Sequence, residues 1–129
     1  MNRLTVALST LIWVIALNTA ASAYDGDWKR GRVYYQGVCT PCHRITKPEG
    51  IPANAYTKAE WTSYLSTDKH NAGKDSVSQY LSVNYRGEIK DKNKVADKFI
   101  AVPDQNLLQD VKAFVINGAK DGDAPAGCN

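Results

Sequence analysis

The clearest pattern of apolar positions lies near the end of the chain, in VPDQNLLQDVKAFVINGAKDG. Its apolar residues fall at positions i, i+1, i+4, i+7 and i+8, namely Leu107, Leu108, Val111, Phe114 and Val115. This spacing is typical of one face of a helix. Pro103 or Asp104 suits its first turn, and Gly118 suits its end. The pattern therefore predicts an amphipathic helix that buries one face.

Shorter helices are predicted in the middle of the chain. TKAEWTSYL opens with Thr57 and Glu60, the spacing of a capping box. It carries three apolar residues on one face, Trp61, Tyr64 and Leu65. SVSQYLS predicts a short helix with three residues facing inward, Val77, Tyr80 and Leu81. A further helical turn or two are expected over residues 94–100, where Val95 and Phe99 are apolar. The remaining segments are predicted to be loops, over residues 44–56, 66–75 and 84–93.

The segment DWKRGRVYYQGV also has a helical pattern, and the chain shows no strand-like alternation. The expected fold class is therefore all-α. Before this segment, residues 1–23 have the form of a secretory signal peptide, with Arg3, an apolar run without charge, and Ala21-Ser22-Ala23 as a cleavage site. The apolar run is shorter than the ~20 residues that a membrane-spanning helix needs, although an uncleaved anchor is the alternative. We expect cleavage before Tyr24 and a periplasmic or otherwise secreted protein.

The mature chain is then one domain over residues 24–129. It has 15 Lys and Arg against 13 Asp and Glu, a net charge of +2. The lysines are scattered among aspartates, so no basic stripe indicates nucleic-acid binding. No paired carboxylates or glycine-rich phosphate loop indicate an enzyme. A domain of this size has a thin core and often depends on a staple or a cofactor.

Chemistry is concentrated in CTPCH, which holds Cys39, Cys42 and His43. A zinc site, a thioredoxin-like redox pair and a small disulfide loop each use a Cys-x-x-Cys pair, but zinc wants four ligands and the redox motif follows a strand. Cys-x-x-Cys-His is the signature of covalent c-type haem attachment. In that chemistry the two thiols add to the vinyl groups of the porphyrin, and His43 coordinates the iron. One covalent haem c is therefore the expected cofactor.

The stretch GRVYYQGVCTPCH resembles the N-terminal helix of class I cytochromes c, with Gly31 eight residues before Cys39 and Tyr35 four before it. The resemblance implies a small cytochrome c-like fold, in which the N- and C-terminal helices cross around one covalently bound haem. Gly31 would allow the close crossing, and Phe114 stands where the family usually places an aromatic residue against the first helix. The family also implies that a loop proline, here Pro52, offers its carbonyl to the other ring nitrogen of the proximal histidine, His43.

The sixth iron position departs from the family, which usually supplies a methionine. The only methionine is Met1, which the predicted cleavage removes. His70, 27 residues after His43 in a loop that Gly73 would help to turn, is the preferred ligand, and a solvent-exposed histidine is the alternative. Cys128 is a less favoured ligand, whose other states are a free thiol or a disulfide joining two chains. An open or water-filled position is the third alternative.

These alternatives decide the expected function. Two protein ligands indicate an electron carrier and not an enzyme, whereas an open position indicates a haem protein that binds gases or peroxide. A small cytochrome subunit of a larger redox complex is a third hypothesis. The expected partners are redox proteins, with membrane contact only through an uncleaved leader or a membrane-bound complex.

Overall fold

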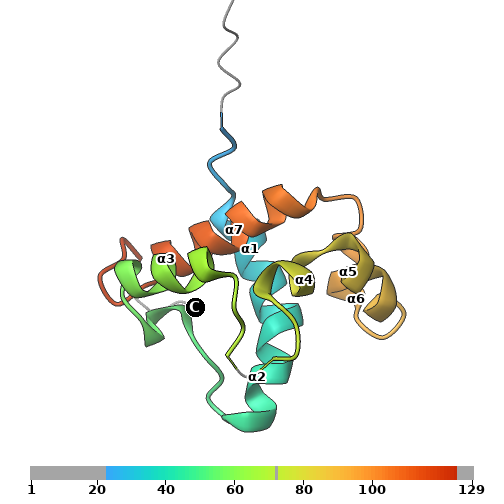
Figure 1. Cartoon of the computed structure of the whole chain (residues 1–129), viewed down its shortest axis with the longest axis horizontal. Helices are drawn as coiled ribbons and strands as arrows, with labels where there is room; N and C mark the ends of the chain where they lie inside the picture. Colours follow the sequence, from blue (N-terminus) through green and yellow to red (C-terminus); the bar gives the residue numbers. More distant parts are fainter. Residues whose placement is uncertain (1–22, 72, 125–129) are drawn as a thin grey trace, which may run out of the picture.

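The computed structural model describes residues 23–71 and 73–124, and these residues form helices and loops without a strand (Figure 1). The α-helices are α1 (Trp28–Tyr34), α2 (Thr40–Thr46), α3 (Lys58–Thr67), α4 (Val77–Leu81), α5 (Val83–Ile89), α6 (Lys94–Lys98) and α7 (Asp104–Asn117). A π-helical segment, η1 (Tyr35–Cys39), joins α1 to α2, and η2 (Ala53–Ala55) is a 3-10 turn. The all-α prediction is confirmed. Among the described helices, none combines the length and apolar character that crossing a membrane requires.

The first and last helices cross at Gly31. A Cβ atom at Gly31 would lie 1.9 Å from the backbone oxygen of Asp110 on α7. Only a residue without a Cβ therefore permits this approach, as the sequence predicted. Tyr35 then packs on Phe114, with ring centroids 5.4 Å apart. The crossing places α1 against α7, and the chain then continues away from α7 through η1 to α2 (Figure 1).

The buried carboxylate of Asp110 also stabilises this crossing of α1 and α7. The side chain of Asp110 is fully buried, forms an ion pair with Arg30 and accepts hydrogen bonds from the Tyr24 hydroxyl (2.6 Å) and the Asp27 amide (2.7 Å). A buried charge is tolerated only when it is paired and hydrogen-bonded in this way. These bonds therefore hold both α1 and the segment before it against α7.

The predicted helix signals are confirmed at several ends. Thr57 and Glu60 form both bonds of the capping box at the start of α3. Ser76 caps α4 by accepting a hydrogen bond from the Gln79 amide. Helix α7 begins directly after Pro103 and ends before Gly118, as its apolar pattern predicted.

The prediction of a loop over residues 84–93 is wrong, because α5 occupies most of it. Gly87 lies within this helix and faces open space. Helix α5 is stabilised by Ser82, which caps it, and by Arg86, which is fully buried. The guanidinium of Arg86 pairs with Asp104 and donates to the carbonyls of Phe99 and Val102. The predicted loop over residues 44–56 likewise contains the end of α2 and the short η2.

The π-helical segment was not predicted. Two of its backbone oxygens accept hydrogen bonds from side chains. The Asn93 amide donates to the oxygen of Gly37 (2.9 Å), and the Thr40 hydroxyl donates to that of Tyr35 (3.1 Å). Gly37 packs directly on Val95, since an added Cβ would lie 2.5 Å from that side chain. Helix α6 therefore supports the segment immediately before the CTPCH motif.

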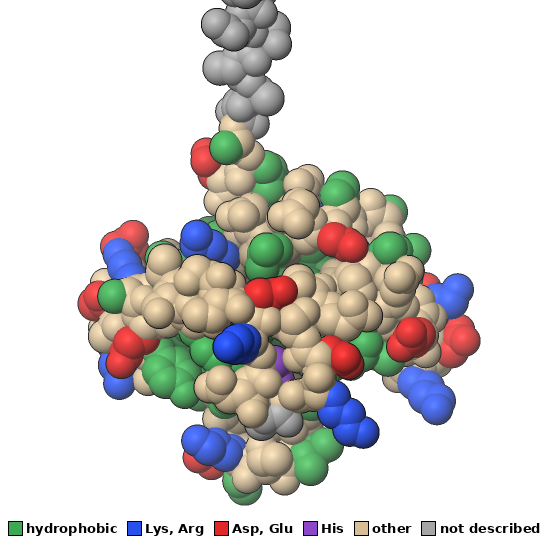
Figure 2. Space-filling model, in the orientation of Figure 1, with side chains coloured by type: hydrophobic (Ala, Val, Ile, Leu, Met, Phe, Trp, Pro, Cys, Tyr) green, Lys and Arg blue, Asp and Glu red, His purple; other side chains and the backbone are tan. Residues whose placement is uncertain are grey.

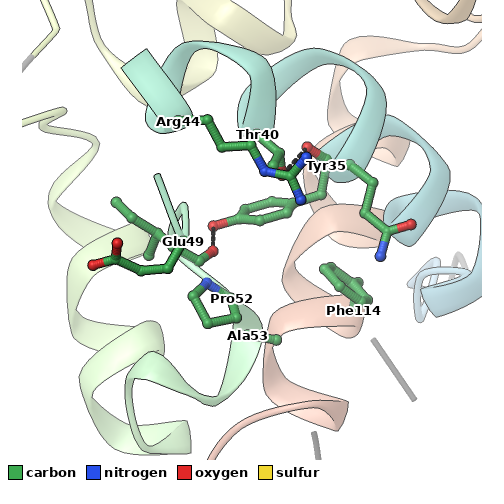
Figure 3. A pocket seen from close by; sticks show the side chains of 9 residues that line it. Tyr35, Thr40, Arg44, Glu49, Pro52, Ala53 and Phe114 are labelled. Atoms are coloured by element: carbon green, nitrogen blue, oxygen red, sulfur yellow. Dashed lines mark hydrogen bonds between the residues drawn. The ribbon is translucent and has the colours of Figure 1, made fainter. Parts of the chain in front are cut away.

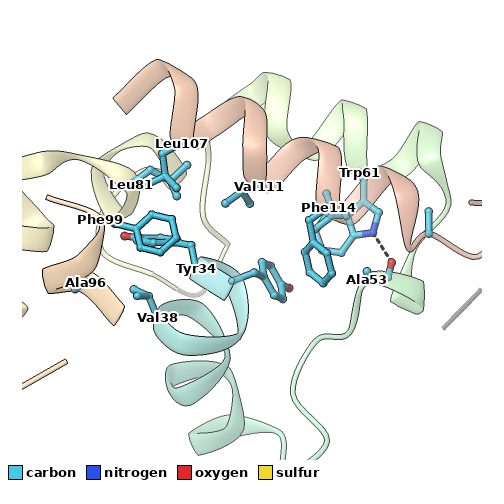
Figure 4. Close-up of a cluster of buried hydrophobic side chains, with 13 residues drawn as sticks. Tyr34, Val38, Ala53, Trp61, Leu81, Ala96, Phe99, Leu107, Val111 and Phe114 are labelled. Carbon is cyan, nitrogen blue, oxygen red and sulfur yellow. Dashed lines mark hydrogen bonds between the residues drawn. The ribbon is translucent and has the colours of Figure 1, made fainter. Parts of the chain in front are cut away.

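The apolar core lies between α7 and the other helices (Figure 4). Tyr34 packs edge-on against Phe99, with ring centroids 5.2 Å apart, and its hydroxyl donates to the oxygen of Tyr80. The buried apolar residues are Tyr34, Tyr35, Val38, Ala53, Trp61, Leu81, Ala96, Phe99, Leu107, Val111, Phe114, Val115 and Ala119. They include the predicted α7 residues except Leu108, which is only partly buried.

Replacing Gly31 by alanine tests the crossing. Because the new Cβ would meet backbone and not a movable side chain, we expect a loss of about 2–3 kcal/mol in unfolding free energy. Urea unfolding followed by circular dichroism measures it. Gly87→Ala is the matched control, since its Cβ has no neighbour within 4 Å and stability should stay equal or rise. Equal stability of Gly31→Ala and the wild type would contradict the close crossing.

Candidate metal centre

A cavity of about 470 Å³ opens between the π-helical segment, α3, α4 and α7. Its walls are mainly aromatic and aliphatic, from Tyr35, Val38, Ile51, Tyr56, Trp61, Tyr64, Leu65, Val77, Tyr80, Leu81, Tyr85, Val111 and Val115. Cys39, Cys42, His43 and His70 also line it, so the structure brings these four predicted residues to one cavity. Figure 2 shows a histidine side chain recessed near the centre of one face, with charged side chains spread around it.

His43 and His70 face each other across this cavity. Their ring planes are only 11° from parallel, and their ring centroids are 6.0 Å apart. Direct contact between two rings would bring their atoms to about 3.5–4.0 Å. The two imidazoles are therefore neighbours with nearly the same orientation, and their centres are farther apart than in a direct face-to-face stack.

Each imidazole has one nitrogen turned away from solvent. The Nδ1 atoms of His43 and His70 are both buried, and neither has a hydrogen-bond partner among the described residues. The Nδ1 atom of His70 lies against the backbone at Gly73. Both side chains therefore carry a buried polar atom that no described residue satisfies.

The environment keeps His43 neutral. Burial lowers the pKa of His43, and the neighbouring His70 lowers it further. A neutral imidazole has a free lone pair, which is the form that binds a metal ion. His43 is therefore in the form that could bind a metal ion at neutral pH.

The two cysteines of the motif are not joined by a disulfide. Cys39 is half-buried and Cys42 is exposed at the cavity edge. Burial raises the pKa of Cys39 to about 12, with a smaller contribution from Cys42. Reactive redox cysteines have lowered pKa values, so this environment does not favour a thioredoxin-like pair. No cluster of three or more metal-binding side chains is found in the described part of the chain, although a zinc site requires four.

Two hydrogen bonds between Asp68 and Ser78, called the Asp68–Ser78 clasp below, close the loop that carries His70. Asp68 ends α3 in the left-handed conformation, with φ 50°. Its carboxylate accepts hydrogen bonds from the Ser78 amide (2.8 Å) and the Ser78 hydroxyl (2.5 Å). The loop between α3 and α4 is therefore closed at its base, and His70 projects from it towards His43.

Aromatic side chains fix the other walls of the cavity. The Tyr35 hydroxyl donates to the oxygen of Ile51 (2.7 Å), and Trp61 Nε1 donates to that of Ala53 (2.6 Å). These bonds hold the segment before η2 against the core. Tyr80 packs beside His70, with ring centroids 5.2 Å apart. The imidazole of His70 is thus bordered by α4 as well as by its own loop.

Pro52 lies elsewhere than the sequence predicted. It lines a second cavity of about 370 Å³, with Tyr35, Arg44 and Phe114 (Figure 3). Its carbonyl accepts a hydrogen bond from the Ala55 amide, and Nδ1 of His43 has no partner. The predicted bond from His43 to Pro52 is not made in this structure. Cys128 and the predicted signal peptide, apart from Ala23, lie outside the described residues.

Sequence reasoning missed the parts that close the site. It did not identify the Asp68–Ser78 clasp, although an aspartate at a helix end and a serine at the next helix start are the residue types that make such bonds. It also missed Tyr85 as a wall residue, because that segment was predicted to be a loop.

Comparison of the chain with protein families, curated proteins and solved structures gives no match.

Removing the carboxylate of Asp68 tests the clasp. Glycine keeps the left-handed backbone, so Asp68→Gly should lose only the two bonds to Ser78, about 1 kcal/mol of unfolding free energy at pH 7. These bonds lower the pKa of Asp68 below its ordinary value of 3.8. Their stabilisation is therefore complete above that value and is lost as the pH falls through the lower, folded-state pKa.

Urea titrations of wild type and Asp68→Gly from pH 7 to pH 2 measure this difference. The two proteins should differ most at neutral pH and converge in acid. Asp68→Asn is the control, because it keeps an acceptor oxygen but does not titrate. A difference that stays constant down to pH 2 would contradict the role of the ionised carboxylate.

Proposed function

We propose that this chain is a monohaem c-type cytochrome that carries electrons, with His43 and His70 as the two axial ligands of one covalently bound haem. Cys39 and Cys42 would form the two thioether links. In each link the thiol sulfur bonds to one vinyl carbon of the porphyrin and the thiol hydrogen goes to the other carbon. The predicted leader supports a periplasmic or otherwise secreted location.

The facing imidazoles are the observation that carries this proposal. For metal–nitrogen bonds of about 2 Å, two imidazoles on opposite sides of one ion have ring centres roughly 6 Å apart. The centroids of His43 and His70 are separated by 6.0 Å, and their rings are nearly parallel. The pair therefore has the spacing that a single metal ion between two imidazoles requires.

The cavity also suits a large apolar cofactor. Its volume of about 470 Å³ lies within the ~300–1,000 Å³ typical of cofactor pockets. Aromatic residues from α3 and α4 provide flat apolar walls, and the cysteine pair stands at one edge. A porphyrin would thus bury its faces against Trp61, Leu81 and Val111 while the motif holds its rim.

The haem, when bound, supplies a one-electron iron couple. The chain's residues would hold that couple in one geometry in both oxidation states. His43 and His70 would both hold the iron, which would leave no position free for a substrate. The apolar walls would cover much of the cofactor, and burial favours the neutral form of His43. These features favour electron transfer over catalysis. A histidine in place of the usual methionine is also expected to lower the reduction potential of the haem iron.

Ligand binding is the second candidate function, and the position of His70 favours it. His70 lies in a loop and not on a helix, whereas His43 is within α2. A ligand held by a loop can leave more readily than one held by a helix, because loops open at lower free energy. Departure of His70 would open the sixth position to a gas or peroxide.

The attachment is tested by Cys39→Ala with Cys42→Ala. Without the thiols no thioether can form, so covalent haem should be lost completely. The small core should also become unstable without the cofactor. A denaturing gel stained for haem peroxidase activity measures the attachment. A double variant that keeps its stain would contradict the proposed links.

The distal ligand is tested by His70→Ala. We expect the ferric haem to change from low spin to high spin, and the reduced haem to bind CO, because one axial nitrogen is lost. Covalent attachment should remain, since Cys39, Cys42 and His43 are unchanged. Electron paramagnetic resonance and visible spectra report the change. A spectrum identical to the wild type would show that His70 is not a ligand.

A further inference from the structure

Gly73 lies where a side chain would displace His70. A Cβ atom built at Gly73 would be 2.1 Å from His70 Nδ1, 2.9 Å from Cγ and 3.0 Å from Cε1. Real Cβ atoms do not approach other heavy atoms below about 3.0 Å. The imidazole of His70 thus occupies the space that the missing side chain leaves.

The backbone of the same turn also fixes His70. The Gly73 amide donates to the oxygen of His70 at 3.2 Å, so the chain folds back over the residue that it follows. Tyr80 borders the ring, with a centroid distance of 5.2 Å. The ring therefore lies beside Gly73 and Tyr80 while it faces His43.

The contact at Gly73 differs in kind from the one at Gly31. Gly31 would strike the backbone of α7, which cannot move without disturbing the fold. Gly73 would strike a side chain, and His70 can move by rotating about two single bonds. A methyl group at position 73 should therefore displace the imidazole and leave the helices in place.

We propose that Gly73 is a positioning residue that determines whether His70 occupies the sixth iron position. This assignment rests on the proposed haem function and deepens it. Glycine at position 73 admits the ring with its Nδ1 against the backbone, which directs Nε2 to the metal. Any larger residue turns the ring away and converts an electron-transfer site into an open, ligand-binding site.

The experiment uses the full holoprotein with Gly73→Ala and the control Gly87→Ala. Gly73→Ala should lose most of the low-spin ferric signal, and its reduced haem should bind CO. External imidazole should restore the low-spin spectrum of Gly73→Ala. It should bind this variant about 10-fold or more tightly than wild type, because residues that orient metal ligands typically change affinity by at least that factor. Gly87→Ala faces open space and should keep the wild-type spectrum.

A double variant separates positioning from a general effect on the loop. In His70→Ala the ring that position 73 would strike is absent. Adding Gly73→Ala to that variant should change neither its spectrum nor its melting temperature. This comparison also tests the role of Gly73 if the single variant Gly73→Ala accumulates poorly. Equal destabilisation by Gly73→Ala with and without the His70 ring would overturn the assignment.

The outcomes for the two proposals are distinct. A wild type with covalent low-spin haem and an unchanged Gly73→Ala spectrum would overturn the role of Gly73 alone. A wild type that carries no covalent haem would overturn both proposals. Loss of the low-spin signal that imidazole restores, with Gly87→Ala unchanged, would support both.

Discussion

The close approach of two backbones at Gly31 is the constraint on which the rest of the structure depends. It allows α1 to lie directly on α7, and the buried Asp110 carboxylate then holds the preceding segment in place. Removing one partner of such a buried pair typically costs several kcal/mol. Since η1 and α2 continue α1, this crossing also determines where Cys39, Cys42 and His43 stand relative to the core.

The two sides of the site are held by different means. His43 follows from a continuous helical path that begins at the crossing. His70 depends on local bonds, namely the Asp68 clasp and the turn at Gly73. The position of His43 is therefore as stable as the fold, and that of His70 is as stable as one loop. Under the proposed haem function, this asymmetry would allow either an electron carrier or a ligand-binding protein.

Elements with strong local signals could be predicted from the sequence. The stripe from Leu107 to Val115 and the Thr57–Glu60 box each specify a helix through neighbouring residues. Helix α5 could not be predicted, because its decisive residue, Arg86, is stabilised by Asp104 and by distant carbonyls. The CTPCH motif and the lone second histidine indicated the site, but their alignment depends on tertiary packing. The role of Pro52 was expected from family resemblance and not from local pattern, and the structure shows no bond between it and His43.

The π-helical segment leads from the crossing at Gly31 to the cysteines of the motif. The number of residues between these two points therefore matters for the site. A π turn accommodates one residue more than an α turn, so deleting one residue between Tyr35 and Cys39 would restore a regular helix. Because the π turn absorbs its extra residue locally, the helix beyond it would then keep roughly the same orientation relative to Gly31. A change of length elsewhere in this helical path, without such a compensating turn, would instead rotate Cys39, Cys42 and His43 by about 100° per residue. The spacing itself is a part of the site.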